Sequence, residues 1–263
     1  MSETFKSQIK DLVDDLKAVF THVGLGGEAA EYKLLTQSFL YKFLNDKFLY
    51  QAKAIDASNS YEKLIDMSEE DYAWLLKFIG TSTAWLKPDQ LIETLHRQQN
   101  EATFYETFEN TLNQIAIDNN DIFSVHTDGD TAIRLFDERL ITDNISDGSK
   151  RNEVAKAIIN LLTRVKFNET IFSQGFDFFS TLFEYMIKDY NKDGGGKYAE
   201  YYTPHSVAKI IADILVGNDQ PSNVRIYDPS AGSGTLLMNL ASRIGVDKTT
   251  VYSQDISQKS SNL

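Results

Sequence analysis

Apolar residues recur at helical spacing through the first two thirds of the chain. One stripe runs from Phe5 to Phe20 and a second from Leu34 to Phe48, with Gly24, Gly26 and Gly27 between them. Similar spacing predicts helices over residues 71–79, 91–96, 104–117 and 152–165. Few segments alternate with the period of a strand, so the pattern predicts a mainly helical domain over residues 1–166, with the aromatic residues in its core.

A connecting segment is predicted over residues 167–196. Residues 176–190, "FDFFSTLFEYMIKDY", have the composition of an aromatic-rich helix, and "NKDGGG" follows. Three consecutive glycines cannot hold a helix cheaply, so we expect a flexible joint at residues 194–196.

The pattern changes over residues 197–263, which we interpret as the first part of an α/β domain. Thr203 and Pro204 are expected to open a helix as N-cap and first helical residue, with an apolar face made of Val207, Ile210, Ile211, Ile214 and Leu215. Residues 224–228 and 251–256 are rich in strand formers, and residues 235–244 between them predict a helix. Strand, glycine turn, helix and strand in this order are typical of a doubly wound, Rossmann-like sheet.

Composition and charge narrow the classes of protein to which this chain can belong. The 263 residues include no cysteine, which excludes disulfides and thiolate metal sites, and the four histidines lie far from any second ligand at metal spacing. The net charge is -12, and from Gly194 onward six basic residues balance six acidic ones, so the excess negative charge lies before Gly194. This argues against strong unaided DNA binding. No stretch approaches the ~20 apolar residues of a membrane span, and residues 1–10 do not resemble a signal peptide. The absence of cysteine suits a reducing cytoplasm, where we expect the protein.

The second glycine-rich stretch, "DPSAGSGTL", predicts a ligand site at the carboxyl ends of the strands. Gly232 and Gly234 lie at the turn, where the missing Cβ lets a ligand approach the backbone. Asp255 follows Gly234 by 21 residues, close to the separation of about 20 typical of a carboxylate that accepts ribose hydroxyls. The spacing therefore predicts a cofactor that contains a nucleoside.

Other interpretations of this turn are weaker or remain open. A P-loop needs Lys after its last glycine, where Thr235 stands, and a dinucleotide motif needs a third glycine where Leu237 stands. A nucleophile elbow needs glycine at Ala231. A plain turn between strand and helix, without a ligand, stays open, as does an NAD-linked protein.

The motifs together resemble those of a known family. "DPSAGSGTLL" resembles motif I of amino-methylating DNA methyltransferases, which use S-adenosylmethionine, and "EYYTP" resembles the motif that precedes it. The stretch from Gly175 to Pro204 and the earlier "EYKLLTQSFLYKFLNDKF" are similar to modification subunits of type I restriction-modification systems. The resemblance extends over nearly the whole chain.

The resemblance implies roles for residues of both motifs. Thr203 and backbone donors at the helix start would bind the cofactor's carboxylate, Asp228 its ammonium group, and Asp255 its ribose hydroxyls. The turn of Gly232, Ser233, Gly234 and Thr235 would border the methionine and the ribose. Residues along the same site would be Glu200, Tyr201, Tyr202, Thr203, Pro204 and His205. The alternative is that these residues bind no ligand. In that case Thr203 only caps the helix, Asp228 is an acid at the end of a strand, and His205 is a solvated residue of the first helical turn.

The family's catalytic Asn-Pro-Pro-Phe motif is absent from this chain. Its four prolines, Pro88, Pro204, Pro221 and Pro229, neither adjoin one another nor follow Asn. In the family this motif binds the flipped adenine. We therefore expect an N-terminal portion of a longer subunit that does not methylate alone, and whether this portion binds cofactor, weakly at most, stays open.

The resemblance also implies partners: DNA through the whole complex, a specificity subunit, a restriction subunit and a second methyltransferase subunit. The rival hypothesis is a non-catalytic helical module that only assembles with the specificity subunit. Copurification with that subunit, independent of cofactor, would favour the rival.

Overall fold

The computed structural model describes residues 3–27, 29–81, 83–123, 125–126, 132–167, 172, 203–232 and 234–255. The chain divides into two compact units, Met1–Gln174 and Gly175–Leu263. The predictions for residues 176–190 and 194–196, and for Glu200, Tyr201, Tyr202 and Ser233, lie outside the described residues. Among the described helices, none is long and apolar enough to cross a membrane.

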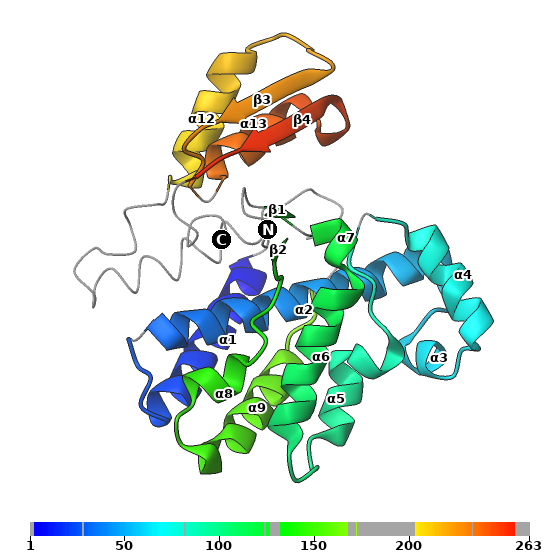
Figure 1. The fold of residues 1–263 in the computed structure, drawn as a ribbon. Coiled ribbons are helices and arrows are strands. Elements are labelled where there is room, and N and C mark those ends of the chain that lie inside the picture. Colours follow the sequence, from blue (N-terminus) through cyan, green and yellow to red (C-terminus); the bar gives the residue numbers. More distant parts are fainter. Residues whose placement is uncertain are drawn as a thin grey trace. The chain divides into compact units, whose positions relative to one another are not determined.

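The first unit is helical, as its apolar periodicity predicts (Figure 1). Its elements are α1 (Glu3–His22), α2 (Ala29–Ile55), α3 (Tyr61–Ile65), α4 (Glu69–Ile79), the 3-10 turn η1 (Pro88–Gln90), α5 (Ile92–Gln98), α6 (Phe104–Asp118), α7 (Asn120–Phe123), α8 (Leu140–Asn144) and α9 (Gly148–Leu162). Two short strands, β1 (Val125–His126) and β2 (Ala132–Ile133), pair antiparallel. The long helix α2 packs against α1, α4, α8 and α9, and α9 also packs against α5 and α6.

Side-chain caps set where several of these helices begin. Helix α4 begins at Glu69, two residues before the predicted start, because the Ser68 hydroxyl accepts the Asp71 N–H at 3.1 Å. Helix α9 begins four residues early, because Asp147 caps it through the Ser149 N–H at 3.0 Å. It ends at Leu162, before the predicted residue 165. The predicted helix over residues 91–96 is α5, shifted toward its carboxyl end.

A buried polar cluster ties distant segments to α2. Lys42 and Asp46 form an ion pair at 2.9 Å, with side chains 4% and 8% exposed. Asp46 also accepts the backbone N–H of Phe167 at 2.8 Å, and the Asn45 side chain accepts that of Ile92 at 3.0 Å. Burial lowers the pKa of Lys42, and the charge of Asp46 opposes that shift. The cluster thus fixes the start of α5 and the chain after α9 against one face of α2.

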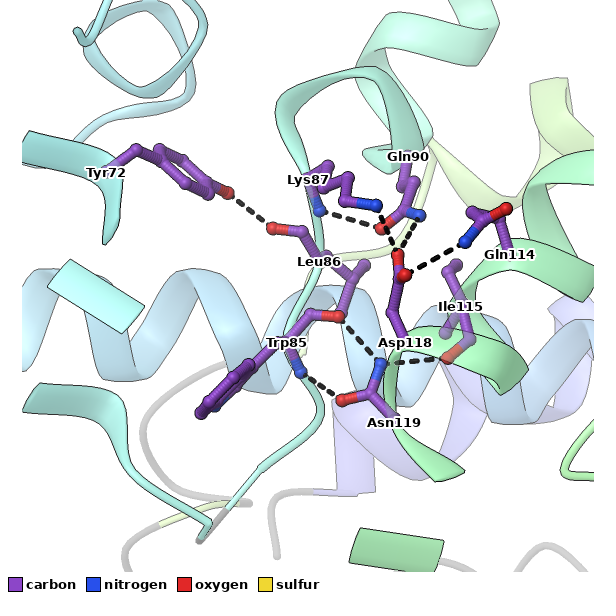
Figure 2. Close-up of polar contacts among 9 residues, drawn as sticks. All are labelled: Tyr72, Trp85, Leu86, Lys87, Gln90, Gln114, Ile115, Asp118 and Asn119. Atoms are coloured by element: carbon purple, nitrogen blue, oxygen red, sulfur yellow. Dashed lines mark hydrogen bonds and ion pairs between the residues drawn. The ribbon is translucent and has the colours of Figure 1, made fainter. Parts of the chain in front are cut away.

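A second polar network joins the chain before α5 to the end of α6 (Figure 2). Buried Asn119 accepts the Trp85 N–H at 2.6 Å and donates to the Trp85 carbonyl at 2.8 Å, so it pairs with both backbone groups of one residue. Asp118 accepts from the side chains of Gln90 at 3.0 Å and Gln114 at 2.9 Å, and pairs with Lys87 at 2.7 Å. Burial alone would raise the pKa of Asp118, but hydrogen bonds from these three side chains outweigh it and lower the pKa.

The second unit contains a strand–helix–strand arrangement. Its elements are α12 (His205–Val216), β3 (Val224–Asp228), α13 (Thr235–Ile244), the 3-10 turn η3 (Val246–Lys248) and β4 (Thr249–Ser253). Strands β3 and β4 pair in parallel, with Val224 opposite Thr249 and Asp228 opposite Ser253. Helix α13 packs on β3 through Ile226, Leu237 and Ala241 (Figure 1). The second strand begins and ends earlier than its predicted span of residues 251–256.

Candidate functional site

The glycine turn begins where β3 ends. Asp228 closes the strand, and its carboxylate accepts the Ser230 N–H at 2.9 Å. Gly232 and Gly234 have φ values of 55° and 74°, in the left-handed region that favours glycine. A Cβ on Gly234 would meet nothing within 4 Å, so its dihedral angle, rather than crowding within the chain, calls for glycine. The turn therefore presents backbone at the carboxyl end of β3 and leads directly into α13.

Asp255 lies beside this turn, as the spacing predicts. Its Oδ2 atom accepts the Gly232 N–H at 2.8 Å, across 23 residues of sequence. The backbones join there as well, because Gln254 donates to the Asp228 carbonyl at 3.0 Å and accepts from Ala231 at 2.9 Å. The structure thus brings Asp228, the two glycines and Asp255 together at one edge of the sheet, where ligands bind in open α/β sheets. Asp255 also supports the turn, a role that spacing alone does not reveal.

The start of α12 differs from its prediction. The N-cap is Pro204 rather than Thr203, and no side chain caps the helix. Pro204 has an extended ψ of 132°, and its carbonyl accepts the first helical hydrogen bonds, from Val207 at 3.0 Å and Ala208 at 3.1 Å. His205 is therefore the first helical residue. Thr203 precedes the cap, where its half-buried side chain does not perform the predicted capping role.

The predicted apolar face of α12 is exposed. Ile214 and Leu215 are 75% and 67% exposed, and Val207, Ile210 and Ile211 are also accessible. The buried residues are Ala208, Ala212 and Val216, on the side that packs against α13. Small side chains let two helices approach closely, which the large aliphatic residues of the other face would prevent. Apolar periodicity thus identified the helix and its aliphatic face, but it did not indicate which face packs against α13.

His205 and a residue that sequence reasoning missed connect α12 to α13. Asn239 lies in α13 and is 8% exposed, and its side-chain amide lies 3.2 Å from Nδ1 of His205. The same amide donates to the Thr235 carbonyl at 2.8 Å. His205 is therefore half-buried and joined to the helix that follows the glycine turn, rather than a solvated first-turn residue. The signal in the sequence was one Asn inside the otherwise apolar run "LLMNLA", since asparagine is a poor helix former.

The structure also describes three further residues of the predicted site, Thr235, Asp228 and Asp255. Their positions alone do not identify a ligand. Thr235 is buried at the start of α13, and Asp228 and Asp255 are half-buried. No group of three or more potential metal ligands occurs within the described part of the chain. The backbone turn and the two carboxylates suit a ligand with hydroxyl and ammonium donors, because such groups bind carboxylate acceptors.

Known proteins match both parts of the chain. Residues 174–263 match the family of N-6 DNA methylases. The type I restriction enzyme MpnII methylase subunit of Mycoplasma pneumoniae is 25% identical over 272 aligned residues, which cover 98% of this chain and 48% of that protein. The type I restriction enzyme MjaIX methylase subunit of Methanocaldococcus jannaschii is 24% identical over 139 residues, covering 48% of this chain and 24% of that protein.

A solved structure has a similar fold. It is the type I restriction-modification system methyltransferase subunit from Streptococcus thermophilus, with a TM-score of 0.65 and 20% sequence identity. The match covers 99% of this chain and 54% of that one, so the chain spans about half the length of this protein and of the Mycoplasma pneumoniae methylase subunit. These matches confirm the resemblance to type I modification subunits that the motifs indicate.

Proposed function

We propose that this chain forms the helical part and the first part of the S-adenosylmethionine site of a type I DNA adenine-N6 methyltransferase. The observation that carries the proposal is the contact of Asp255 with the Gly232 N–H, beside two parallel strands joined through α13. Parallel strands joined through a helix, with a glycine turn after the first strand and an acid after the second, are typical of a Rossmann-like cofactor domain, and this likeness supports the proposal. The similarity to methylase subunits supports methyl transfer as the reaction.

Each described residue of the site has a role suited to its chemistry. Asp255 accepts the ribose hydroxyls, and Asp228 accepts from the ammonium group of the methionine part. The backbone from Gly232 to Thr235 borders the ribose and methionine, and Thr203 lies on the side of the cofactor's carboxylate. The cofactor supplies a methyl group on a sulfonium ion, which the whole enzyme would transfer to the adenine amino group.

The partners of the whole enzyme are part of the same proposal. DNA, a specificity subunit, a restriction subunit and a second methyltransferase subunit would assemble around the complete protein in the cytoplasm. The net charge of -12 supports DNA contact through such partners, because an acidic chain gains little from phosphate neutralisation. The acidic helical unit would then serve mainly in assembly.

Titration calorimetry with S-adenosylmethionine tests the proposal on the 263-residue chain. We expect measurable binding, weakened about tenfold or more by Asp255→Asn, because hydrogen bonds to a charged acceptor are worth more than neutral ones. Asparagine retains an oxygen that can accept the Gly232 N–H, so the turn should persist.

Asp247→Asn is the matched control for this experiment. Asp247 is exposed in η3, before the amino end of β4, so the same loss of charge should leave the affinity unchanged. Equal affinities for the wild-type chain and Asp255→Asn would contradict the ribose role. Binding of a nicotinamide cofactor in place of S-adenosylmethionine would favour the NAD-linked alternative.

A further inference from the structure

Asn239 is a buried polar side chain whose two contacts reach both segments of the proposed site. Its amide nitrogen donates to the Thr235 carbonyl at 2.8 Å and lies 3.2 Å from Nδ1 of His205. Thr235 directly follows Gly234, and His205 directly follows Pro204. One side chain therefore connects the first residues of the two helices that follow the two sequence motifs.

The hydrogen-bonding groups of the Asn239 side chain indicate which ring nitrogen of His205 carries the proton. A carbonyl oxygen only accepts, so the Thr235 carbonyl requires that the NH₂ group of Asn239 faces it. The second hydrogen of that NH₂ group is then available to Nδ1 of His205, which must accept with its lone pair. If the Asn239 amide donates to Nδ1 in this way, the proton of the His205 ring is placed on Nε2.

The opposite ends of the same helices have a separate connection. The Arg243 guanidinium donates from Nε to Asp213 at 2.8 Å and from another nitrogen to the Gly217 carbonyl at 2.8 Å. Between the two connections, buried Ala208 and Ala212 lie on the α12 face that packs against α13. The helix pair is thus joined at both ends, and Asn239 makes the connection at the end where the glycine turn lies.

We propose that Asn239 is a positioning residue of the cofactor site: it holds His205 as the Nε2–H tautomer and fixes the start of α12 against the glycine turn. The proposal rests on the proposed function and deepens it, since the start of α12 would form part of the site. Asn239 acts through His205 and Thr235 and does not itself need to touch the cofactor.

Two measurements on the 263-residue chain test this role. Nitrogen-15 NMR of the histidine rings should show a single Nε2–H tautomer for His205 in the wild-type chain and a tautomer mixture in Asn239→Ala. Calorimetry should show S-adenosylmethionine affinity about three- to tenfold weaker in Asn239→Ala, the range expected for loss of one or two hydrogen bonds. In the His205→Ala background, Asn239→Ala should cost less affinity than it does in the wild-type chain, because the two side chains share a contact and only the hydrogen bond to Thr235 is left to lose.

Arg243→Ala is the matched control, because it removes the connection at the other end of the helix pair. It should lower the melting temperature, while the affinity changes less than about twofold and the tautomer is unchanged. Equal loss of affinity in both variants would overturn the specific role of Asn239 and indicate general loosening of the helices. If Asn239→Ala fails to fold, the wild-type tautomer and the affinity of His205→Ala decide the question.

The contact between Asn239 and His205 and the cofactor site can be tested separately. A protonated Nδ1 on His205 in the wild-type chain would overturn the contact, whatever the cofactor result. Absence of S-adenosylmethionine binding by the wild-type chain would overturn the proposed function and the positioning role together, while a fixed tautomer would still establish the contact.

Discussion

Single side chains hold backbone segments together in both units of this protein. In the first unit, Asn119 pairs with the N–H and the carbonyl of Trp85, much as a neighbouring strand would, and also donates to the Ile115 carbonyl at 2.9 Å (Figure 2). In the second unit, Asp255 binds the glycine turn. Both side chains replace regular backbone pairing where the chain is irregular, so their removal leaves backbone groups without partners.

Asn119→Ala should therefore destabilise the first unit strongly. Asn119 is fully buried, and its loss leaves the Trp85 N–H and carbonyl without these hydrogen bonds, so we expect the free energy of unfolding to fall by about 2–4 kcal/mol. Urea denaturation followed by tryptophan fluorescence measures this change.

Asn113→Ala, in the helix α6 that ends just before Asn119, is the control for that substitution. Its side chain makes one exposed hydrogen bond, to the Glu138 carbonyl at 3.0 Å, and we expect a cost below about 1 kcal/mol. Equal costs for the two variants would show that the pairing with Trp85 contributes little.

At the scale of elements, α12 shows that the face a helix buries depends on what it packs against. Its large aliphatic residues are exposed, whereas Ala208 and Ala212 lie toward α13. A close helix–helix contact selects small residues even when larger apolar residues are available on another face. The exposed aliphatic face is a property of the described structure that the apolar pattern alone did not predict.

Two lysine substitutions on α12 distinguish its faces. Ile214→Lys should change the free energy of unfolding by less than about 0.5 kcal/mol, because Ile214 is 75% exposed. Ala212→Lys should cost about 2 kcal/mol or more, because Ala212 is 2% exposed and a lysine there must displace α13 or bury its charge. Urea denaturation followed by far-ultraviolet circular dichroism compares them, and the reverse order would contradict the described packing.

At the scale of the whole molecule, the two units differ in the extent of their described cores. The first buries many large side chains, including fully buried Phe20, Phe39, Phe104 and Phe108. The described core of the second is the small cluster around Ile226, Leu237 and Ala241, and Tyr227 and Tyr252 of its paired strands are 61% and 51% exposed. Since stability follows buried apolar area, the second unit should be the less stable one.

The positions of the tryptophans make this difference measurable. Both tryptophans, Trp74 and Trp85, belong to the first unit, so their fluorescence reports only on that unit, whereas circular dichroism reports on helices of both. We expect circular dichroism to show a transition at lower urea than fluorescence does, and S-adenosylmethionine to shift that earlier transition alone. If circular dichroism and fluorescence showed the same transition, the two units would unfold together, and the predicted difference in stability would be contradicted.

Local features of this protein were predictable because they depend on neighbouring residues. Apolar spacing identified the main helices of the first unit, strand formers identified β3 and β4, and the distance from Gly234 to Asp255 identified the acid that reaches the turn. Boundaries differed by a few residues, since caps such as Ser68 and Pro204 depend on local backbone angles that composition does not specify.

By itself, the sequence determined the helical character of the first unit, the strand–turn–helix–strand order of the second and the resemblance to type I modification subunits. Only the tertiary structure decided which face of α12 is buried, that Asn239 joins His205, and that Asn119 pairs with Trp85. The physical reason is the separation along the sequence. Periodicity and turn chemistry depend on residues that are close in the sequence, whereas these contacts join residues about thirty positions apart. Such contacts form only when packing brings their elements together.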